Sequence, residues 1–166
     1  MIAIIDSGGA NIASVQFALE RLGAKSVLTR DVAEIVAADR VILPGVGAAP
    51  VAINILRNAQ LIEPIRKLRQ PVLGICLGMQ LLFDRSFEGD TDLLGILDGE
   101  CRAFTTAGGL SVPHMGWNEL EIKSLGHPVF KNVNQGAFFY FVHSFHMKLK
   151  EEKFVLATTD YGGPIA

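Results

Sequence analysis

The sequence predicts an α/β protein with three layers, in which a doubly wound, mostly parallel sheet is extended by an antiparallel part. Three observations lead to this fold class. Short apolar runs alternate with segments of helical periodicity as far as Phe87, Gly and Pro fall between these segments, and strand-like segments follow one another after Gly95. Alternation of strand and helix is typical of a parallel sheet with helices on both faces, whereas consecutive strands usually pair antiparallel.

The first half of the chain is expected to alternate strictly. Ile2–Ile5 is a short apolar run, as in a buried strand, and the helix after it begins at the N-cap candidate Asn11. The same criteria predict strands at Ser26–Thr29, Arg40–Leu43 and Pro71–Ile75, and helices at Val32–Ala38, Ala52–Arg69 (in two pieces around Pro64) and Leu77–Phe87.

The fourth strand and the second half of the chain differ in character. Pro71–Ile75 is apolar after its proline, which is typical of a strand buried on both faces in the middle of a parallel sheet. Beyond Gly95 the expected elements are strands, at Gly99–Phe104, Trp117–Ile122, Phe138–Phe145 and Phe154–Thr159.

Composition limits the function classes. Apolar residues make up 49% of the 166 residues, so the chain can bury a core, and the length predicts a single domain over residues 1–166. The 15 basic and 17 acidic residues give a net charge of −2, so the chain lacks the excess positive charge that favours binding to nucleic acid or to an anionic membrane surface. No apolar run has the roughly 18 residues that a membrane span needs.

The number of cysteines and the spacing of possible metal ligands indicate what to expect about the compartment and about cofactors. Cys76 and Cys101 are too few for a disulfide scaffold, so the expected compartment is the reducing cytoplasm. No group of His, Cys, Asp and Glu residues has the spacing of a zinc site, and neither a metal nor another cofactor is expected.

The most informative segment is residues 74–78, which read G-I-C-L-G between an expected strand and an expected helix. This is the cysteine form of the nucleophile elbow, where a strand reverses sharply into a helix and strains the residue at the turn. Small residues at Gly74 and Gly78 would let strand and helix approach closely. The alternative is a buried structural cysteine between unrelated glycines, and the order of strand, cysteine and helix favours the nucleophile.

A second glycine-containing turn, Pro44–Gly47, follows the third expected strand. In a parallel sheet this turn would lie beside Cys76, at the edge where open α/β sheets bind ligands. Backbone N–H groups in such a turn can face a developing negative charge. Taken alone, the turn is an ordinary strand-to-helix connection, and its expected position beside a reactive thiol favours an oxyanion site.

Together, Leu43–Gly47 and Gly74–Phe83 resemble the oxyanion and nucleophile segments of the class I glutamine amidotransferases. The resemblance runs from Met1 to about Gly163 and implies a flavodoxin-like α/β fold. Pro113–Asn118 and Tyr140–Phe145 are similar to the glutaminase subunits that deliver ammonia to a cyclase subunit, a (β/α)₈ barrel, in histidine biosynthesis.

The resemblance implies a role for each matching residue. Cys76 would attack the carboxamide carbon of L-glutamine, and N–H groups at Leu77, Val46 and Gly47 would meet the oxyanion. The residues implied to bind glutamine are Gly45, Gln80 and Glu88 (the last two at its α-amino end), and His143 and Ser144, which would hold its α-carboxylate through backbone groups. The residues implied to face the cyclase subunit are Met115, Trp117, Asn118 and Tyr140.

One part of the family pattern is missing from the sequence. The family completes its catalytic triad with a His and a Glu in a His-Pro-Glu motif, whereas this chain has only His127-Pro128-Val129. The sequence therefore predicts a domain that lacks its C-terminal strand and helix, and a 166-residue form without activity. Two alternatives to a glutaminase are a Cys-elbow hydrolase or chaperone of a related α/β superfamily, and a non-catalytic binding subunit.

Overall fold

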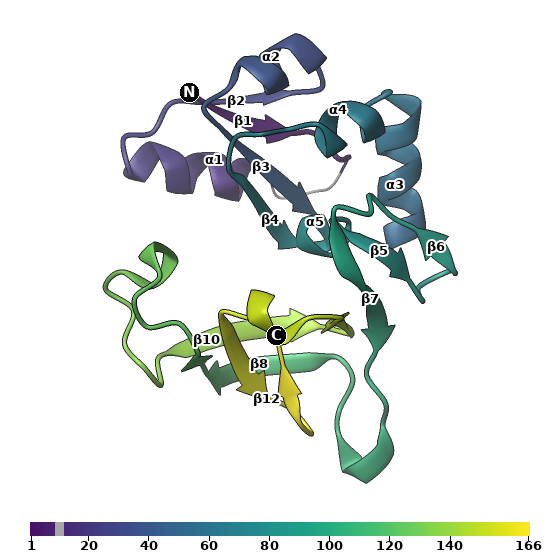
Figure 1. Cartoon of the computed structure of the whole chain (residues 1–166), viewed down its shortest axis with the longest axis vertical. Coiled ribbons are helices and arrows are strands. Elements are labelled where there is room, and N and C mark those ends of the chain that lie inside the picture. Colours follow the sequence, from purple (N-terminus) through teal and green to yellow (C-terminus); the bar gives the residue numbers. More distant parts are fainter. Residues whose placement is uncertain (9–11) are drawn as a thin grey trace. The chain divides into compact units, whose positions relative to one another are not determined.

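The computed structural model describes residues 1–8 and 12–166, so the expected N-cap Asn11 lies outside the described residues. These residues form two compact units, Met1–Leu97 and Asp98–Ala166 (Figure 1). The first unit contains the parallel sheet and its helices, and the second consists mainly of antiparallel strands. The predicted fold class is confirmed in both of its parts.

Unit 1 is built on a four-stranded parallel sheet in the order β2-β1-β3-β4. The strands are β1 (Ile2–Ile5), β2 (Ser26–Thr29), β3 (Arg40–Gly45) and β4 (Val72–Cys76). On one face Ile4 and Ile42 pack with Leu19 of the first helix. Ala3 and Ile5, which alternate with Ile4 and so face the other side, are also fully buried. Both faces of the central strand are therefore covered, as a doubly wound sheet requires.

Four helices connect these strands: α1 (Ile12–Arg21), α2 (Val32–Ala37), α3 (Ala49–Asn58) and α4 (Ile62–Arg66). The expected division of this helical segment into two pieces is confirmed, but the break lies before Pro64 and not at it. The chain leaves the helical path at residues 59–61, where Gln60 has a φ of 57°, and Pro64 lies in the first turn of α4. A proline fits there because the first N–H groups of a helix have no intrahelical acceptor.

The position of β4 in the sheet also differs from the expectation. β4 is an edge strand, and its side chains at Leu73 and Ile75 are 57% and 37% exposed. Within the part of the chain that the structure describes, β4 pairs with β3 alone in this sheet. An apolar run shows that a strand favours burial, but it does not reveal what covers the strand, and the prediction of a central strand is wrong.

The predicted helix Leu77–Phe87 is a single turn, α5 (Leu77–Gln80), followed by a hairpin of β5 (Phe83–Ser86) and β6 (Thr91–Asp92). Backbone bonds from Leu94 N–H to the Leu81 carbonyl and from Leu93 N–H to the Asp84 carbonyl, both 2.9 Å, hold the returning chain. The turn between the strands has positive φ at Gly89 and Asp90. This turn chemistry, together with hairpin bonding, overrides the apolar helical pattern.

Unit 2 confirms the antiparallel extension, with shifted boundaries. Its strands are β7 (Leu97–Ala103, beginning at the unit boundary), β8 (His114–Glu119), β9 (Glu121–Ile122), β10 (Phe138–His143), β11 (Phe145–Leu149), β12 (Ala157–Asp160) and β13 (Pro164–Ile165). β11 pairs with β7, β10 with β8, and β12 with both β9 and β13, all antiparallel. Short 3₁₀ turns lie at Ala107–Gly109, Pro128–Phe130 and Glu152–Phe154.

Two of the expected strands in unit 2 are each divided in the structure. The segment around Trp117 breaks at Leu120, between β8 and β9, and the segment around Phe141 breaks at Ser144, between β10 and β11. At the second break the chain passes from one sheet to another. Among the described helices of the whole chain, none combines the length and the apolar character that a membrane span requires.

The elbow in unit 1 leads to a prediction about stability. A Cβ on Gly78 would lie 1.8 Å from the Leu43 carbonyl oxygen, so Gly78→Ala must push two backbone segments apart. We expect it to lower the free energy of unfolding by about 3 kcal/mol or more, as in overpacked cores. The matched control is Gly126→Ala, since a Cβ at Gly126 meets open space and should change little. Equal urea unfolding curves for both variants would contradict the close approach.

Candidate active site

Cys76 occupies a sharp strand-to-helix turn, as the sequence predicts. It is the last residue of β4, and α5 begins at the next residue. In Figure 1, α5 follows directly on the end of β4. The backbone of Cys76 has φ 53° and ψ −119°, a combination that residues with a Cβ rarely adopt, and its side chain is exposed. Strain of this kind is typical of a nucleophile held out from a turn.

Three glycines make the turn possible. A Cβ on Gly74 would lie 2.5 Å from the Met79 Cα, and a Cβ on Gly45 would lie 2.8 Å from the Gly78 backbone nitrogen. With the contact of Gly78 described above, these approaches bring β4, α5 and the end of β3 together backbone to backbone. The predicted reason for small residues at Gly74 and Gly78 is thus confirmed, and Gly45 is a third such position.

The oxyanion candidates lie where the sequence places them. In the register of β3 and β4, Gly45 pairs with Cys76, so Val46 and Gly47 directly follow the partner of the nucleophile. Val46 is 48% exposed, and Gly47 has a φ of 89°. Leu77 is the first residue of α5, where a backbone N–H has no intrahelical acceptor. Their role in binding an oxyanion remains a prediction.

A residue that the sequence analysis missed holds this turn. The Ser7 hydroxyl donates a 2.6 Å hydrogen bond to the carbonyl oxygen of Pro44, and Ser7 is only 3% exposed. Ser7 follows β1, and the two partners are 37 residues apart. No local pattern could have indicated such a pair, because parallel strands bring their carboxyl ends together only in the folded sheet.

The structure shows contacts that the sequence did not predict for Glu88. One carboxylate oxygen of Glu88 accepts a 2.7 Å hydrogen bond from the Ala49 N–H, the first residue of α3. Ala48, at the N-cap position, has no side chain that could do this. Glu88 therefore caps α3 from the β5–β6 turn. Gln80 is buried in α5, and binding of glutamine by either residue remains a prediction.

The two residues predicted to bind the α-carboxylate of glutamine lie at a bend in unit 2. His143 ends β10, Ser144 forms the bend, and β11 begins at Phe145. The Ser144 carbonyl accepts a 3.0 Å hydrogen bond from the Phe104 N–H. His143 is hydrogen-bonded at both ring nitrogens, to His114 at 2.9 Å and to the Phe145 carbonyl at 2.8 Å.

Aromatic rings surround these histidines. Phe104 stacks on His146 with ring centroids 4.9 Å apart, and it meets His143 edge-on at 5.1 Å. Burial lowers the pKa of both His114 and His146, and the charge of His143 acts in the same direction on each. Both ring nitrogens of His114 lie within hydrogen-bond distance of a partner, His143 at 2.9 Å and Asn118 at 3.4 Å.

The candidate interface residues divide between two faces of the β8–β10 pair. Met115, Trp117 and Tyr140 lie on one face and are 61%, 70% and 55% exposed. Trp117 pairs with Tyr140 across the strands, and their rings meet edge to face at 5.6 Å. Asn118 differs, since its side chain turns to the other face and donates to the Asp160 carbonyl at 2.8 Å. An apolar interface at Trp117 would therefore not include the Asn118 side chain.

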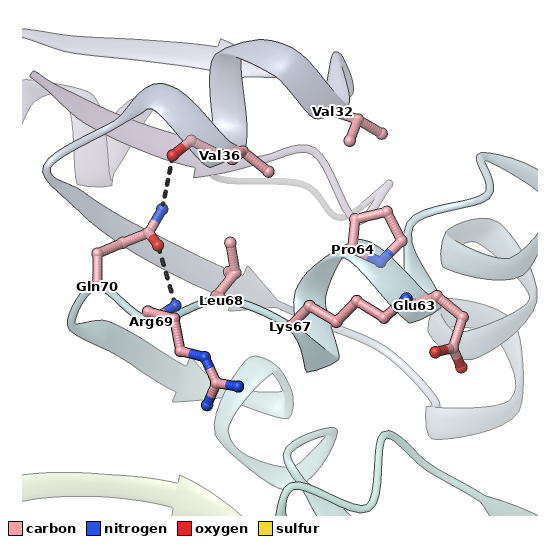
Figure 2. Close-up of a pocket in the computed structure, with 8 residues that line it drawn as sticks. All are labelled: Val32, Val36, Glu63, Pro64, Lys67, Leu68, Arg69 and Gln70. Atoms are coloured by element: carbon pink, nitrogen blue, oxygen red, sulfur yellow. Dashed lines mark hydrogen bonds between the residues drawn. The ribbon is translucent and has the colours of Figure 1, made fainter.

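A cavity of about 620 Å³ in unit 1 contains none of the predicted site residues (Figure 2). The Gln70 side chain borders it, donating to the Val36 carbonyl at 3.4 Å and accepting from the Arg69 N–H at 3.2 Å. The lining residues are Val32, Val36, Glu63, Pro64, Lys67, Leu68, Arg69 and Gln70. The segment 67–70 precedes β4, whereas Cys76 is at its far end, so this cavity is separate from the candidate active site.

The remaining predictions concern Cys101 and metals. Cys101 is fully buried in β7 and its thiol is free. Among the residues that the structure describes, no three His, Cys, Asp or Glu side chains are grouped so that they could hold a metal ion.

Comparison with known proteins agrees with this geometry. Residues 3–166 match the family "Glutamine amidotransferase class-I". A solved structure of a glutamine amidotransferase superposes with a TM-score of 0.75 at 18% identity, covering 99% of this chain and 82% of that one. A glutamine amidotransferase from Thermotoga maritima gives 0.65 at 18% identity, covering 96% and 66%. At such identities the two structures show the fold alone.

Relatives found by sequence have a much higher identity to this chain than these two solved structures. The imidazole glycerol phosphate synthase subunit HisH of Xanthomonas axonopodis pv. citri is 48% identical over 162 residues, and that of Xylella fastidiosa (strain Temecula1) is 49% identical. Each match covers 98% of this chain and 80% of the relative. The chain belongs to the class I glutamine amidotransferase family. Within that family it belongs with the HisH subunits, which decides against a hydrolase or chaperone of a related superfamily.

The histidine cluster predicts how stability depends on pH. Because the pKa values of His114 and His146 are lowered from 6.5, the unfolded chain binds more protons than the folded chain just below that pH. Their contribution to the free energy of unfolding is complete above about pH 6.5 and is lost as the pH falls through the folded-state pKa values. Urea unfolding at about pH 7.5 and about pH 5 should show this loss.

A variant separates the histidines from the carboxylates. Hydrogen bonds from the N-terminus and from Lys123 lower the pKa values of Asp39 and Glu121, from 3.8 and 4.5, so these groups act at lower pH. His146→Phe, which can still stack on Phe104, should lose less stability between the two pH values than the wild type. An undiminished loss in this variant would contradict a contribution of His146.

Proposed function

We propose that this protein hydrolyses L-glutamine to glutamate at Cys76 and supplies the released ammonia to the cyclase subunit of imidazole glycerol phosphate synthase, in histidine biosynthesis. The observation that carries the proposal is the turn at Cys76, whose strained backbone and exposed thiol lie in register with Gly45. The relatives named above are subunits of that synthase, which supports the assignment of the acceptor.

The chemistry follows from the groups around the turn. The Cys76 thiolate adds to the carboxamide carbon of glutamine, and the carbonyl oxygen becomes an oxyanion that accepts hydrogen bonds from N–H groups at Leu77 and in the Val46–Gly47 turn. Collapse of this intermediate breaks the C–N bond and releases ammonia after proton transfer to nitrogen. Water then attacks the γ-glutamyl thioester, releases glutamate and restores the thiol.

Further residues of each unit are proposed to hold the substrate. Gly45 and Gln80 of unit 1 line the approach to Cys76, and the carboxylate of Glu88 attracts the α-amino group while it also caps α3. In unit 2, backbone N–H groups at His143 and Ser144 bind the α-carboxylate. Backbone donors at a bend are suited to a carboxylate because they are fixed before the substrate arrives.

The general base is proposed to lie outside residues 1–166. His127-Pro128 is followed by Val129 instead of a Glu, and the His127 ring accepts a hydrogen bond from the Val129 N–H in a surface turn. Without a base, Cys76 has no partner that could protonate the leaving ammonia. A polypeptide of residues 1–166 should therefore show no glutamine turnover with the cyclase subunit, and normal turnover would make one of its four histidines the base.

The exposed face of β8 and β10 is proposed as the surface that binds the cyclase subunit. Met115, Trp117 and Tyr140 present a large, rigid apolar area, and aromatic residues of this kind dominate binding energy at protein interfaces. Asn118 supports this surface from behind through its bond to the Asp160 carbonyl.

The nucleophile is tested by substitution. The substitution is made in the full protein as its gene encodes it, which is assayed with its cyclase subunit. Cys76→Ala should lower the rate of glutamine hydrolysis by about a millionfold or to background, because no other group can form the thioester. Cys101→Ala is the matched control, since Cys101 is buried away from solvent and should leave the rate nearly unchanged. Wild-type ammonia release by the Cys76 variant would exclude this nucleophile.

The side chain of Val46 is expected to limit the rate of glutamine hydrolysis until the cyclase subunit binds. Its β-branched side chain resists the backbone rotation that would turn a second N–H toward the oxyanion, and losing one such donor costs about 3 kcal/mol, roughly a hundredfold in rate. The wild type should therefore be slow alone, faster with the cyclase subunit, and fastest when that subunit also holds its nucleotide ligand.

Variants at Val46 test this gate. Val46→Gly should raise the rate of the free subunit, whereas Val46→Ala keeps a Cβ and should stay close to the wild type. Equal wild-type rates in all three conditions would refute the gate.

The docking surface predicts a change in affinity. Trp117→Ala should raise the concentration of cyclase subunit that gives half-maximal stimulation by about tenfold or more, as expected of a central aromatic residue. Leu125→Ala is a suitable control, because Leu125 is 67% exposed but belongs to the turn that follows β9 and not to β8 or β10. If both variants change the half-maximal concentration equally, the cyclase subunit does not bind at the surface of Met115, Trp117 and Tyr140.

A further inference from the structure

Four strands of unit 2 (β8, β10, β11 and β12) are joined by a row of side-chain hydrogen bonds. His114 on β8 and His143 at the end of β10 meet through Nδ1 and Nε2, 2.9 Å apart. His143 Nδ1 lies 2.8 Å from the carbonyl oxygen of Phe145, where β11 begins. At the other end, the Asn118 amide nitrogen lies 3.4 Å from His114 Nε2 and 2.8 Å from the Asp160 carbonyl oxygen.

The direction of each hydrogen bond follows from the carbonyl groups at the two ends. A carbonyl oxygen can only accept, so His143 carries its proton on Nδ1, and its neutral ring presents Nε2 as an acceptor. That nitrogen accepts from the His114 Nδ1–H, which leaves His114 Nε2 to accept from the Asn118 amide. Each ring therefore has one permitted tautomer, and the row is complete only while both rings are neutral.

The surroundings favour a neutral ring at His114. His114 is 3% exposed, and its ring stacks between those of Phe141 and Tyr161, with centroids at 4.9 and 3.9 Å. Burial and the neighbouring His143 together lower the pKa of His114. Among the described residues, the other titratable side chains near the pair are Tyr161, which stacks on His114, and His146, which interacts electrostatically with His143.

The row spans the bend at Ser144. His143 pairs with His114 in one sheet, and Phe145 pairs with Ala103 in another. The His143 ring bridges this change of sheet by holding the Phe145 carbonyl from the residue before the bend. The path of the backbone through Ser144 thus depends on the orientation of the His143 ring, and that orientation depends on the proton that His114 donates.

We propose that His114 is a positioning residue for glutamine: acting through His143, it fixes the backbone at Ser144 in the conformation that binds the α-carboxylate. The inference rests on the proposed function, which assigns that carboxylate to backbone N–H groups at His143 and Ser144. His114 itself contacts neither the substrate nor the reacting atoms. Its loss should therefore weaken glutamine binding and leave the chemical step nearly intact.

The test compares three variants of the gene-encoded protein, assayed with its cyclase subunit. His114→Phe keeps a ring between Phe141 and Tyr161 but removes the donor, and it should raise KM for glutamine about tenfold, the worth of one buried hydrogen bond, with kcat within about twofold. His114→Asn places an amide N–H near the Nδ1 position and should restore KM to within about threefold. His146→Phe, in the same aromatic cluster but outside the row, should leave both constants unchanged.

The pH profile adds a readout that a merely structural role would not move. In the wild type KM should rise as the pH falls through the lowered pKa of His114, because the added proton turns Nε2 into a donor that faces the Asn118 amide and breaks the row. In His114→Phe, KM should be high at all pH values and lack that rise. An unchanged KM in His114→Phe at neutral pH, or a KM in His146→Phe that is raised as much as in His114→Phe at that pH, would overturn the inference.

Two controls keep the outcomes separate. If the wild-type protein hydrolyses no glutamine with its cyclase subunit, the proposed function fails, whereas an active wild type with an unaffected His114→Phe variant refutes the positioning role alone. If His114→Phe does not fold, ¹⁵N NMR of the histidine rings in the wild type decides. Protons on Nδ1 of both His114 and His143 would support the row, and any other tautomer, or a charged ring near neutral pH, would overturn it.

Discussion

At Gly78 the first turn of α5 lies directly against the carbonyl group of Leu43, with no room for even one methyl group between them. This approach fixes three things at once: how sharply the chain reverses after β4, where the thiol of Cys76 points, and how near the end of β3 lies to it. A side chain at Gly78 would separate the nucleophile from the turn that follows β3. The site is therefore a consequence of backbone packing, and few side chains are needed to build it.

The same packing bears on the turn after β3, which is proposed to bind the oxyanion. Pro44 is held by the buried hydroxyl of Ser7, and Gly45 is pressed against α5, so the entrance of the turn cannot move freely. Val46 and Gly47 lie just beyond these contacts, half exposed and at positive φ respectively. The gate that is proposed for the oxyanion donor would act in this part of the turn, beyond the contacts that hold Pro44 and Gly45.

Local chemistry was sufficient to predict the elbow and the class of fold, whereas pairing between distant segments was not. The order of strand, Cys76 and helix can be recognised from five consecutive residues, because glycine is needed on both sides of the turn. The helix after it was overestimated, since an apolar pattern cannot anticipate the bonds that Leu94 makes back to Leu81. The cap that Glu88 provides for α3 depends on segments 39 residues apart and has no local signal.

A comparable limit applies to the second unit. Residues 138–145 are predicted as one strand, but the break at Ser144 depends on which sheet each half joins. The inward turn of Asn118 and the pairing of His114 with His143 depend on cross-strand register, which becomes visible only in the folded sheet.

The central claim, that Cys76 is the nucleophile of a glutaminase, can be tested most directly by trapping its covalent intermediate. The gene-encoded protein and its cyclase subunit are mixed with isotopically labelled glutamine, quenched with acid during turnover, and mapped by mass spectrometry. The account predicts a γ-glutamyl thioester on the peptide that contains Cys76 and none on the peptide that contains the buried Cys101. Turnover without any label on Cys76, or with the label on another residue, would contradict it.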